Sequence, residues 1–256
     1  MRKFRPAVLL TMALSFAAFS CNKPGAPAPL ATATPLLTLD PATRGSVSGI
    51  VSFDGPIPAP KPIDMSAAPD CQRLHATPAD FPDVVTDDHR ALANVVVYVK
   101  SVLGRYDFPR PAAPAILGQK GCLYEPHVVA LRVGQSLEIS NEDSTVHNIH
   151  ALPKINSAWN RSEQPNQPPV VVNFEHPELA IPLMCNVHPW MRGYLFVFDH
   201  PYFAVTSRSG AFSLANLPPG TYTIEAWQEK FGTLDQSVTV APHSAQTVSF
   251  RFHAVP

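Results

Sequence analysis

The feature that most constrains the fold of this chain is a series of short β-branched and aromatic runs, each bounded by proline, glycine, asparagine or aspartate. Such runs between turn signals indicate strands, and apolar residues do not recur at helical spacing over any length. We therefore predict an all-β protein of the sandwich type. The expected strands are residues 47–53, 94–100, 128–133, 136–140, 170–174, 193–198, 203–206, 221–227, 237–240 and 247–252.

Composition limits the remaining choices. The chain has 256 residues, which is room for one large or two modest domains. Its 29 prolines favour long connections between strands, and residues 56–90, rich in proline and aspartate, are expected to form a long loop. The net charge is −1, so no basic stripe is available to bind a phosphate backbone. Nucleic acid is therefore not an expected partner.

The N-terminus has the three-part layout of a secretory signal over residues 1–20: a basic start, an apolar run over residues 7–19 and then Ser20 before Cys21. The apolar run is shorter than the roughly 20 residues that cross a bilayer, so we expect export with cleavage rather than a membrane anchor. Cys21 follows in the manner of a bacterial lipoprotein box, which it resembles although Phe19 and Ala18 depart from it. Cys21 is the lipidation candidate, and simple cleavage after Ser20 is the alternative.

Residues 21–44 are rich in proline, alanine and threonine and contain little that could form a core. We expect an extended tether that holds an exported domain away from the membrane surface, in the periplasm or cell envelope. A plain disordered N-terminus of a soluble exported protein fits the same composition.

Four cysteines in an oxidising compartment each need a role. Cys21 belongs to the processing site and Cys185 to a loop described below, which leaves Cys71 and Cys122 as a candidate disulfide. A second interpretation joins these two cysteines with His75 and His127 in a Cys2His2 metal site. Free thiols are the third.

The C-terminal part reads SRSGAFSLANLPPGTYTIEAW over residues 207–227 and ends with the strand TVSFRF. It resembles the carboxypeptidase regulatory-like (prealbumin-like) β-sandwich family. The two opening strands of that family match GIVSF at 49–53 and LANVVVYV at 92–99, far upstream. We therefore predict one sandwich in two parts, residues 45–104 and 200–256, with a domain of residues 105–199 inserted between them. Two consecutive domains are the alternative.

The stretch CNVHPWMRG, residues 185–193, places a thiol, an imidazole and a thioether close together. Together with His147 upstream, Cys185, His188 and Met191 make a His2Cys set with a weak axial methionine, which is the donor set of blue copper. Zinc would leave the methionine unexplained. His150 cannot face the same site from the strand of His147, because residues three apart point to opposite faces. It is the substitute if His147 points away.

Three motifs, LRVGQSLEISNED at 131–143, VHN at 146–148 and the 185–193 loop, resemble the cupredoxin family, specifically its amicyanin and plastocyanin branch. The resemblance covers roughly residues 118–198 and implies a cupredoxin β-sandwich with one type 1 copper ion. By it the ligands are His147, Cys185, His188 and Met191, and Asn148 links the two ligand loops. Pro189 and Trp190 are expected to form an apolar rim around an exposed imidazole edge of His188, through which an electron passes.

These expectations indicate an exported electron carrier that exchanges single electrons with a donor and an acceptor redox protein. The resemblance does not identify these partners, because the chain outside it has no counterpart in a bare cupredoxin. We find no acid–base pair or nucleophile constellation elsewhere, so we do not expect an enzyme. The alternatives are a cell-envelope binding or scaffold protein with structural or absent copper, and a protein of copper delivery or storage.

Overall fold

The computed structural model describes residues 37–101, 103–104 and 106–254. The predicted signal peptide, Cys21 and the tether up to residue 36 lie outside the described residues. At the described end of the tether, the short turn η1 (Pro41–Thr43) is capped by Asp40, and Leu37 pairs with Tyr106, so this end is not simply extended. In the described part, no helix has both the length and the apolar character that crossing a bilayer requires.

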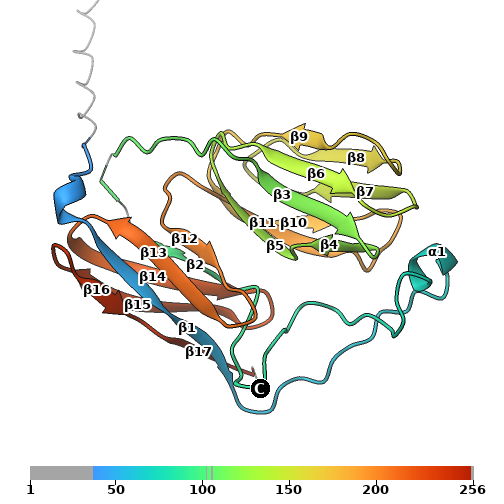
Figure 1. The fold of residues 1–256 in the computed structure, drawn as a ribbon, viewed down its shortest axis with the longest axis horizontal. Coiled ribbons are helices and arrows are strands. Elements are labelled where there is room, and N and C mark those ends of the chain that lie inside the picture. Colours follow the sequence, from blue (N-terminus) through green and yellow to red (C-terminus); the bar gives the residue numbers. More distant parts are fainter. Residues whose placement is uncertain (1–36, 102, 105, 255–256) are drawn as a thin grey trace, which may run out of the picture. The chain divides into compact units, whose positions relative to one another are not determined.

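The described residues form four β-sheets, which confirms the predicted all-β fold (Figure 1). The middle of the chain supplies two sheets, which we call the first sandwich. One has the order β4-β3-β6-β9 and the other β5-β11-β10-β7-β8. Their strands are β3 (Ala115–Lys120), β4 (Leu123–Glu125), β5 (Val128–Arg132), β6 (Leu137–Asn141), β7 (His147–Ala151), β8 (Trp159–Glu163), β9 (Val170–Val172), β10 (Glu178–Met184) and β11 (Arg192–Phe198).

The core of the first sandwich follows from alternation along its strands, because successive side chains of a strand point to opposite faces. In β6, Leu137 and Ile139 are buried, and in β10 so are Ile181 and Leu183, while the residues between them are more exposed. These side chains from the two sheets meet in one apolar cluster. The burial of both inner faces is what holds the two sheets together.

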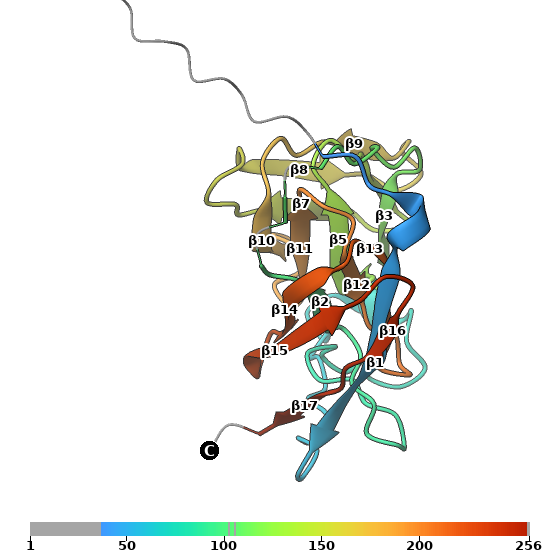
Figure 2. The same ribbon diagram turned by 90° about the vertical axis from the view of Figure 1, so that its left-hand side faces the viewer.

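The second sandwich combines strands from both ends of the described chain (Figure 2). β1 pairs with β13, β16 and β17, and β2 pairs with β12 and β14, which in turn pairs with β15. The strands are β1 (Gly45–Asp54), β2 (Val96–Val99), β12 (Phe203–Val205), β13 (Ala211–Leu217), β14 (Gly220–Gln228), β15 (Gly232–Val240), β16 (Ala245–Thr247) and β17 (Phe250–His253). Strands before residue 100 thus share sheets with strands after residue 200.

A further apolar cluster contains residues of strands from both sandwiches. Val96 and Tyr98 of β2 pack with Val128 of β5 and with Phe196 and Phe198 of β11. All five side chains are buried. The outer faces of β2 and β11 are therefore not solvated faces.

Residues 56–90, which we call the covering segment, form the long loop that the sequence predicts, with one short helix, α1 (Pro69–Gln72). Pro69 at the first position suits a helix start because the missing N–H has no intrahelical acceptor there. Most of the segment is exposed, but Ile63, Met65 and Cys71 are buried in the core cluster of the first sandwich. These three side chains anchor an otherwise irregular segment.

The turn between β5 and β6 is made at Gly134, whose φ of 74° lies in the left-handed region that favours glycine. β5 and β6 lie in different sheets, so this turn carries the chain from one sheet to the other. The strand prediction needs one correction. It missed β3, β4, β7, β8, β10 and β13, whose sequences mix polar residues, glycine or proline with the apolar ones.

Candidate metal centre

The candidate metal centre lies where β7 begins and β10 ends. These strands are antiparallel neighbours, with Met184 opposite His150 and Leu183 opposite Ala151. Continuing this register brings the first residue of β7, His147, level with the loop that follows β10. Two parts of the chain that are remote in sequence are thus placed side by side by strand pairing alone.

The loop between β10 and β11 is held closed by its own backbone. Cys185 N–H donates to the carbonyl of Met191 at 3.1 Å, and Met191 N–H donates to the carbonyl of His188 at 2.9 Å. The amide of His188 also donates to Cys185 Sγ at 3.3 Å. These bonds turn Cys185 and His188 toward the same point, and the Met191 side chain is buried in the same core cluster.

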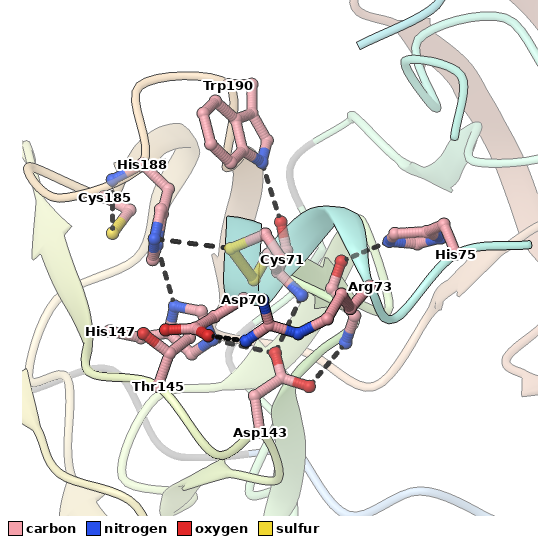
Figure 3. The surroundings of a disulfide bond; sticks show 12 residues. Asp70, Cys71, Arg73, His75, Asp143, Thr145, His147, Cys185, His188 and Trp190 are labelled. Carbon is pink, nitrogen blue, oxygen red and sulfur yellow. Dashed lines mark hydrogen bonds and ion pairs between the residues drawn. A yellow bond between two sulfur atoms is a disulfide. The ribbon is translucent and has the colours of Figure 1, made fainter. Parts of the chain in front are cut away.

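Three of the predicted ligands converge. One ring nitrogen each of His147 and His188 and the Sγ of Cys185 all lie within 4.8 Å of one another. The Nδ1 atoms of His147 and His188 are 3.0 Å apart, and the three residues are between 0 and 5 % exposed. Figure 3 shows His188 lying between Cys185 on one side and His147 below it.

Asp143 orients His147 from behind. Its Oδ2 accepts a hydrogen bond from His147 Nε2 at 2.8 Å, and its two oxygens accept the amides of Gly121 and Cys122 at 2.8 and 2.7 Å. With the proton on Nε2, the lone pair of Nδ1 is free and faces the other candidate metal ligands. A carboxylate behind a ligand histidine commonly fixes its tautomer in this way. The sequence analysis missed this residue, and its one signal is an acidic side chain four positions before the histidine.

The charges of the site favour the metal-binding forms of Cys185 and His188, whereas His147 is held more readily in its protonated form. Burial alone lowers the pKa of His147, but the hydrogen bond to Asp143 and the nearby Cys185 sulfur raise it above its usual value. Burial raises the pKa of the Cys185 thiol, but hydrogen bonds from His147 and from the His188 amide bring it below its usual value. Burial lowers the pKa of His188. A thiolate beside a neutral imidazole is the state in which both bind metal.

Asn148 joins the two parts of the site. Its Oδ1 accepts the amide of Asn186 in the loop at 3.0 Å, and its Nδ2 donates to the carbonyl of Arg161 in β8 at 2.9 Å. The bond to Asn186 joins the two ligand-bearing parts, as the resemblance implies for this residue, and the bond to Arg161 joins β7 to β8. His150, on the opposite face of β7, is half-buried, and its Nδ1 lies 3.4 Å from Oδ1 of Asn186.

The outer edge of His188 is covered, and the prediction of an exposed imidazole edge is wrong. Its Nε2 lies 3.4 Å from the Sγ of Cys71, which the covering segment brings against the ring. Trp190 packs on the other side, with ring centroids 5.2 Å apart, and its Nε1–H donates to the carbonyl of Cys122 at 3.0 Å. Pro189 is exposed and Trp190 half-buried, but the imidazole they flank is only 5 % exposed.

Cys71 and Cys122 form a disulfide in the structure. The alternative Cys2His2 site is not assembled, because the two histidines are engaged elsewhere. His75 Nε2 lies 2.7 Å from the carbonyl of Gly121, and His127 is paired with Glu229. Among the described cysteines, Cys185 is the one with a free thiol.

The donor set fits copper. Two imidazole nitrogens and a buried thiolate are borderline and soft ligands, which copper accepts and which magnesium or calcium does not prefer. Strands and a closed loop hold these groups before any ion binds. His147, Cys185 and His188 are therefore a candidate ligand group for such a metal, and the buried Met191 lies in the same loop as two of them.

Comparison with known proteins adds two findings. No curated protein sequence matches the chain. Residues 198–253 match the family model of the carboxypeptidase regulatory-like domain.

Among solved structures, the chain is similar to a copper-containing nitrite reductase from Thermus scotoductus SA-01, at 19% identity and a TM-score of 0.32, covering 40% of this chain and 25% of that one. It is also similar to an oxidized proline-to-alanine variant of amicyanin, at 20% identity and a TM-score of 0.30, covering 33% and 82%. A purple cupredoxin from Nitrosopumilus maritimus aligns at 21% identity and a TM-score of 0.29, covering 33% and 99%. The chain thus spans a quarter of the nitrite reductase, and these scores are low. The match to the family model lies in the C-terminal part of the chain, where the sequence predicts a carboxypeptidase regulatory-like domain.

Proposed function

We propose that the protein is an exported type 1 copper protein that carries single electrons between redox proteins of the cell envelope. The observation that carries this proposal is the convergence of His147, Cys185 and His188 in one buried group. Copper bound there would supply one-electron exchange between its cuprous and cupric states. Met191 supports the proposal as the fourth ligand that such a site uses.

The protein's own contribution is to hold the ligands still. Asp143 fixes the ring of His147, and Asn148 ties the loop to β7 and β8. Two backbone bonds and one bond from an amide to the Cys185 sulfur close the loop. Because strands and hydrogen bonds define the ligand positions, little rearrangement accompanies a change of charge. Small rearrangement favours fast electron transfer, and the bonds around the Cys185 sulfur tune the reduction potential.

The place of action is part of the proposal and rests on the sequence. A secretory signal over residues 1–20, a lipid on Cys21 and a tether over residues 21–44 would keep the folded part at the outer surface of a membrane. Oxidising surroundings there suit the disulfide between Cys71 and Cys122. The redox donor and acceptor are proteins of the same compartment.

The proposal is tested by the visible spectrum of copper-loaded protein. We expect an intense thiolate-to-copper band in the cupric form, and Cys185→Ala should abolish it because the band needs the sulfur. His150→Ala is the matched control, since His150 lies on the same strand as His147 but on the opposite face, and it should keep the band. Absence of the band from the wild type would overturn the proposal.

Two further measurements separate the alternatives. A carrier should give a reversible one-electron wave in voltammetry, whereas a scaffold with structural copper should give none. A carrier should also release copper slowly to a chelator, because the described ligands are buried. Rapid exchange would indicate delivery or storage instead.

A further inference from the structure

A second group of metal-binding side chains lies directly against the first. The sulfurs of Cys71 and Cys122 and one ring nitrogen of His188 lie within 4.8 Å of one another, and all three residues are buried. His188 belongs to both groups through its two nitrogens. Its Nδ1 faces His147 at 3.0 Å, and its Nε2 faces Cys71 Sγ at 3.4 Å, as Figure 3 shows.

The surroundings hold this second group in place. The amide of Cys122 is fixed by Asp143 and its carbonyl by Trp190, while Cys71 sits in α1 against the imidazole. His75, close in sequence to Cys71, is directed to the carbonyl of Gly121 instead. The histidine that completes the cysteine pair is therefore His188, 117 positions away from Cys71.

In the oxidised chain this group cannot bind a metal through thiolates, because the two sulfurs are bonded to each other. A dithiol reductant can change this by thiol–disulfide exchange. The bond between Cys71 and Cys122 breaks, the two sulfurs receive two electrons and two protons, and the reductant becomes a disulfide. When a metal ion then binds, each thiol that ligates it releases its proton to solvent.

We propose that the reduced chain has a second metal site, made of Cys71, Cys122 and His188 Nε2, for a soft cation such as Cu(I). Two thiolates and one imidazole are donors that select Cu(I) or zinc over hard cations. Closing the disulfide removes the site and leaves the Cys71 sulfur sealing the outer edge of His188. The redox state of the cysteine pair thus decides whether a metal can be held on the outward side of the copper ligand.

The covering segment gives the buried sulfurs a way to react. It is irregular over most of its length, its single helix is one turn long, and its buried apolar anchors besides Cys71 are Ile63 and Met65. Segments with few buried contacts open locally at low free-energy cost. A reductant or a metal ion can therefore reach Cys71 without unfolding either sandwich.

The test measures Cu(I) affinity against a chromophoric Cu(I) chelator in the Cys185→Ala variant, anaerobically, with the cysteine pair either oxidised or reduced by a phosphine. This variant removes the thiolate of the first site, so a gain in affinity on reduction reports the cysteine pair of the second. We expect the reduced form to bind one Cu(I) per chain about tenfold or more tightly than the oxidised form. Equal affinities in the two forms would overturn the inference.

Variants identify the ligands. Adding Cys71→Ser should lower the affinity of the reduced protein to that of the oxidised form, while His75→Ala, in the same covering segment, should not change it. Retention of tight binding in the serine variant would also contradict the site. Should the serine variant fail to fold, titration of the reduced and oxidised protein with Cd²⁺ decides, because thiolate-to-cadmium absorption in the ultraviolet should appear only after reduction.

This inference and the proposed function can fail separately. The blue band is measured on oxidised wild type and depends on Cys185, whereas the Cu(I) titration uses a chain that lacks this thiol. If the blue band appears but the reduced variant does not bind Cu(I) more tightly, the second site is contradicted and the electron-carrier proposal stands. If the reduced variant binds Cu(I) more tightly but the wild type shows no blue band, the electron-carrier proposal is contradicted and the second site stands.

Discussion

The two sandwiches of this protein treat buried polar groups differently. In the second sandwich the core is apolar, and two buried tyrosines in it donate to backbone carbonyls, Tyr222 to Pro218 at 2.7 Å and Tyr202 to Asn216 at 3.1 Å, while the buried hydroxyl of Tyr98 donates to the side chain of Glu225. In the first sandwich, six of the buried polar side chains gather around the candidate metal centre. They are Gln119, Asp143, His147, Asn148, Glu163 and His188.

The difference separates buried polar groups that maintain the fold from those that belong to the candidate site. A buried polar group is costly unless it is paired, and the hydroxyls of Tyr202 and Tyr222 are each paired with a backbone carbonyl. In the group around His147, the possible metal-ligand atoms of His147, Cys185 and His188 instead point toward one another. It also leaves Oε1 of Glu163 and Oε1 of Gln119 without a hydrogen-bond partner among the described residues. Local departures from good packing of this kind are expected at functional sites.

The largest effect should come from the core that has no such site. Phe250 is fully buried in the second sandwich, and Phe250→Ala should lower the free energy of unfolding by about 3–5 kcal/mol, because it removes apolar contacts and leaves a cavity. Denaturant unfolding measures this loss. The visible spectrum of the copper-loaded variant should match the wild type below the transition. A changed spectrum would show that the two sandwiches are not independent.

A smaller effect, dependent on pH, should come from the first sandwich. Burial raises the pKa of Glu163 to about 7, although the hydrogen bond from Gln119 opposes this. The native state therefore keeps a proton that the unfolded state has lost, so stability is greatest at low pH and falls as the pH rises through 7. Relative to Glu163→Gln, the wild type should lose up to about 3 kcal/mol between pH 5 and 8.

The control for this profile is Glu175→Gln, at an exposed position after β9. It keeps Glu163 and should keep the decline of stability with pH. Parallel pH profiles of the wild type and Glu163→Gln, followed by denaturant unfolding, would show that Glu163 does not carry a shifted titration.

Much of the fold is predictable because its signals are local. The β-branched runs at 128–133 and 193–198 correspond to β5 and β11, and the ligand loop could be read from the spacing of its residues. The strand pattern of the carboxypeptidase regulatory-like family also predicted that β1 and β2 would join strands near the C-terminus. Such patterns depend on neighbouring residues and on the order of motifs.

The missed features depend on contacts that have no local signal. That Cys71 would lie against His188 follows from where an irregular segment packs, and no period or motif records it. Likewise Asp143 is one of several acidic residues in its turn, and only the folded chain shows that His147 and two amides bind it. The burial of Glu163 depends on the placement of β8, whose polar sequence did not predict a strand.

The smallest effects compare two side chains with the same structural task. Asn148 in the first sandwich accepts one backbone amide and donates to one backbone carbonyl, besides its bond to the Asn160 side chain. Thr206 in the second sandwich likewise accepts the amide of Val95 at 3.0 Å and donates to the carbonyl of Leu92 at 2.8 Å. Asn148→Ala and Thr206→Val should each lower the free energy of unfolding by about 1–2 kcal/mol, because each leaves backbone groups unpaired.

The two variants should nevertheless differ in the visible spectrum. Asn148 ties the ligand loop to β7 and β8, so its loss should shift or broaden the thiolate-to-copper band, whereas Thr206 ties strands that hold no ligand. The comparison breaks if Thr206→Val perturbs the band as strongly as Asn148→Ala does. Equal stability losses with unequal spectra would separate a hydrogen bond that only maintains the fold from one that also positions a ligand.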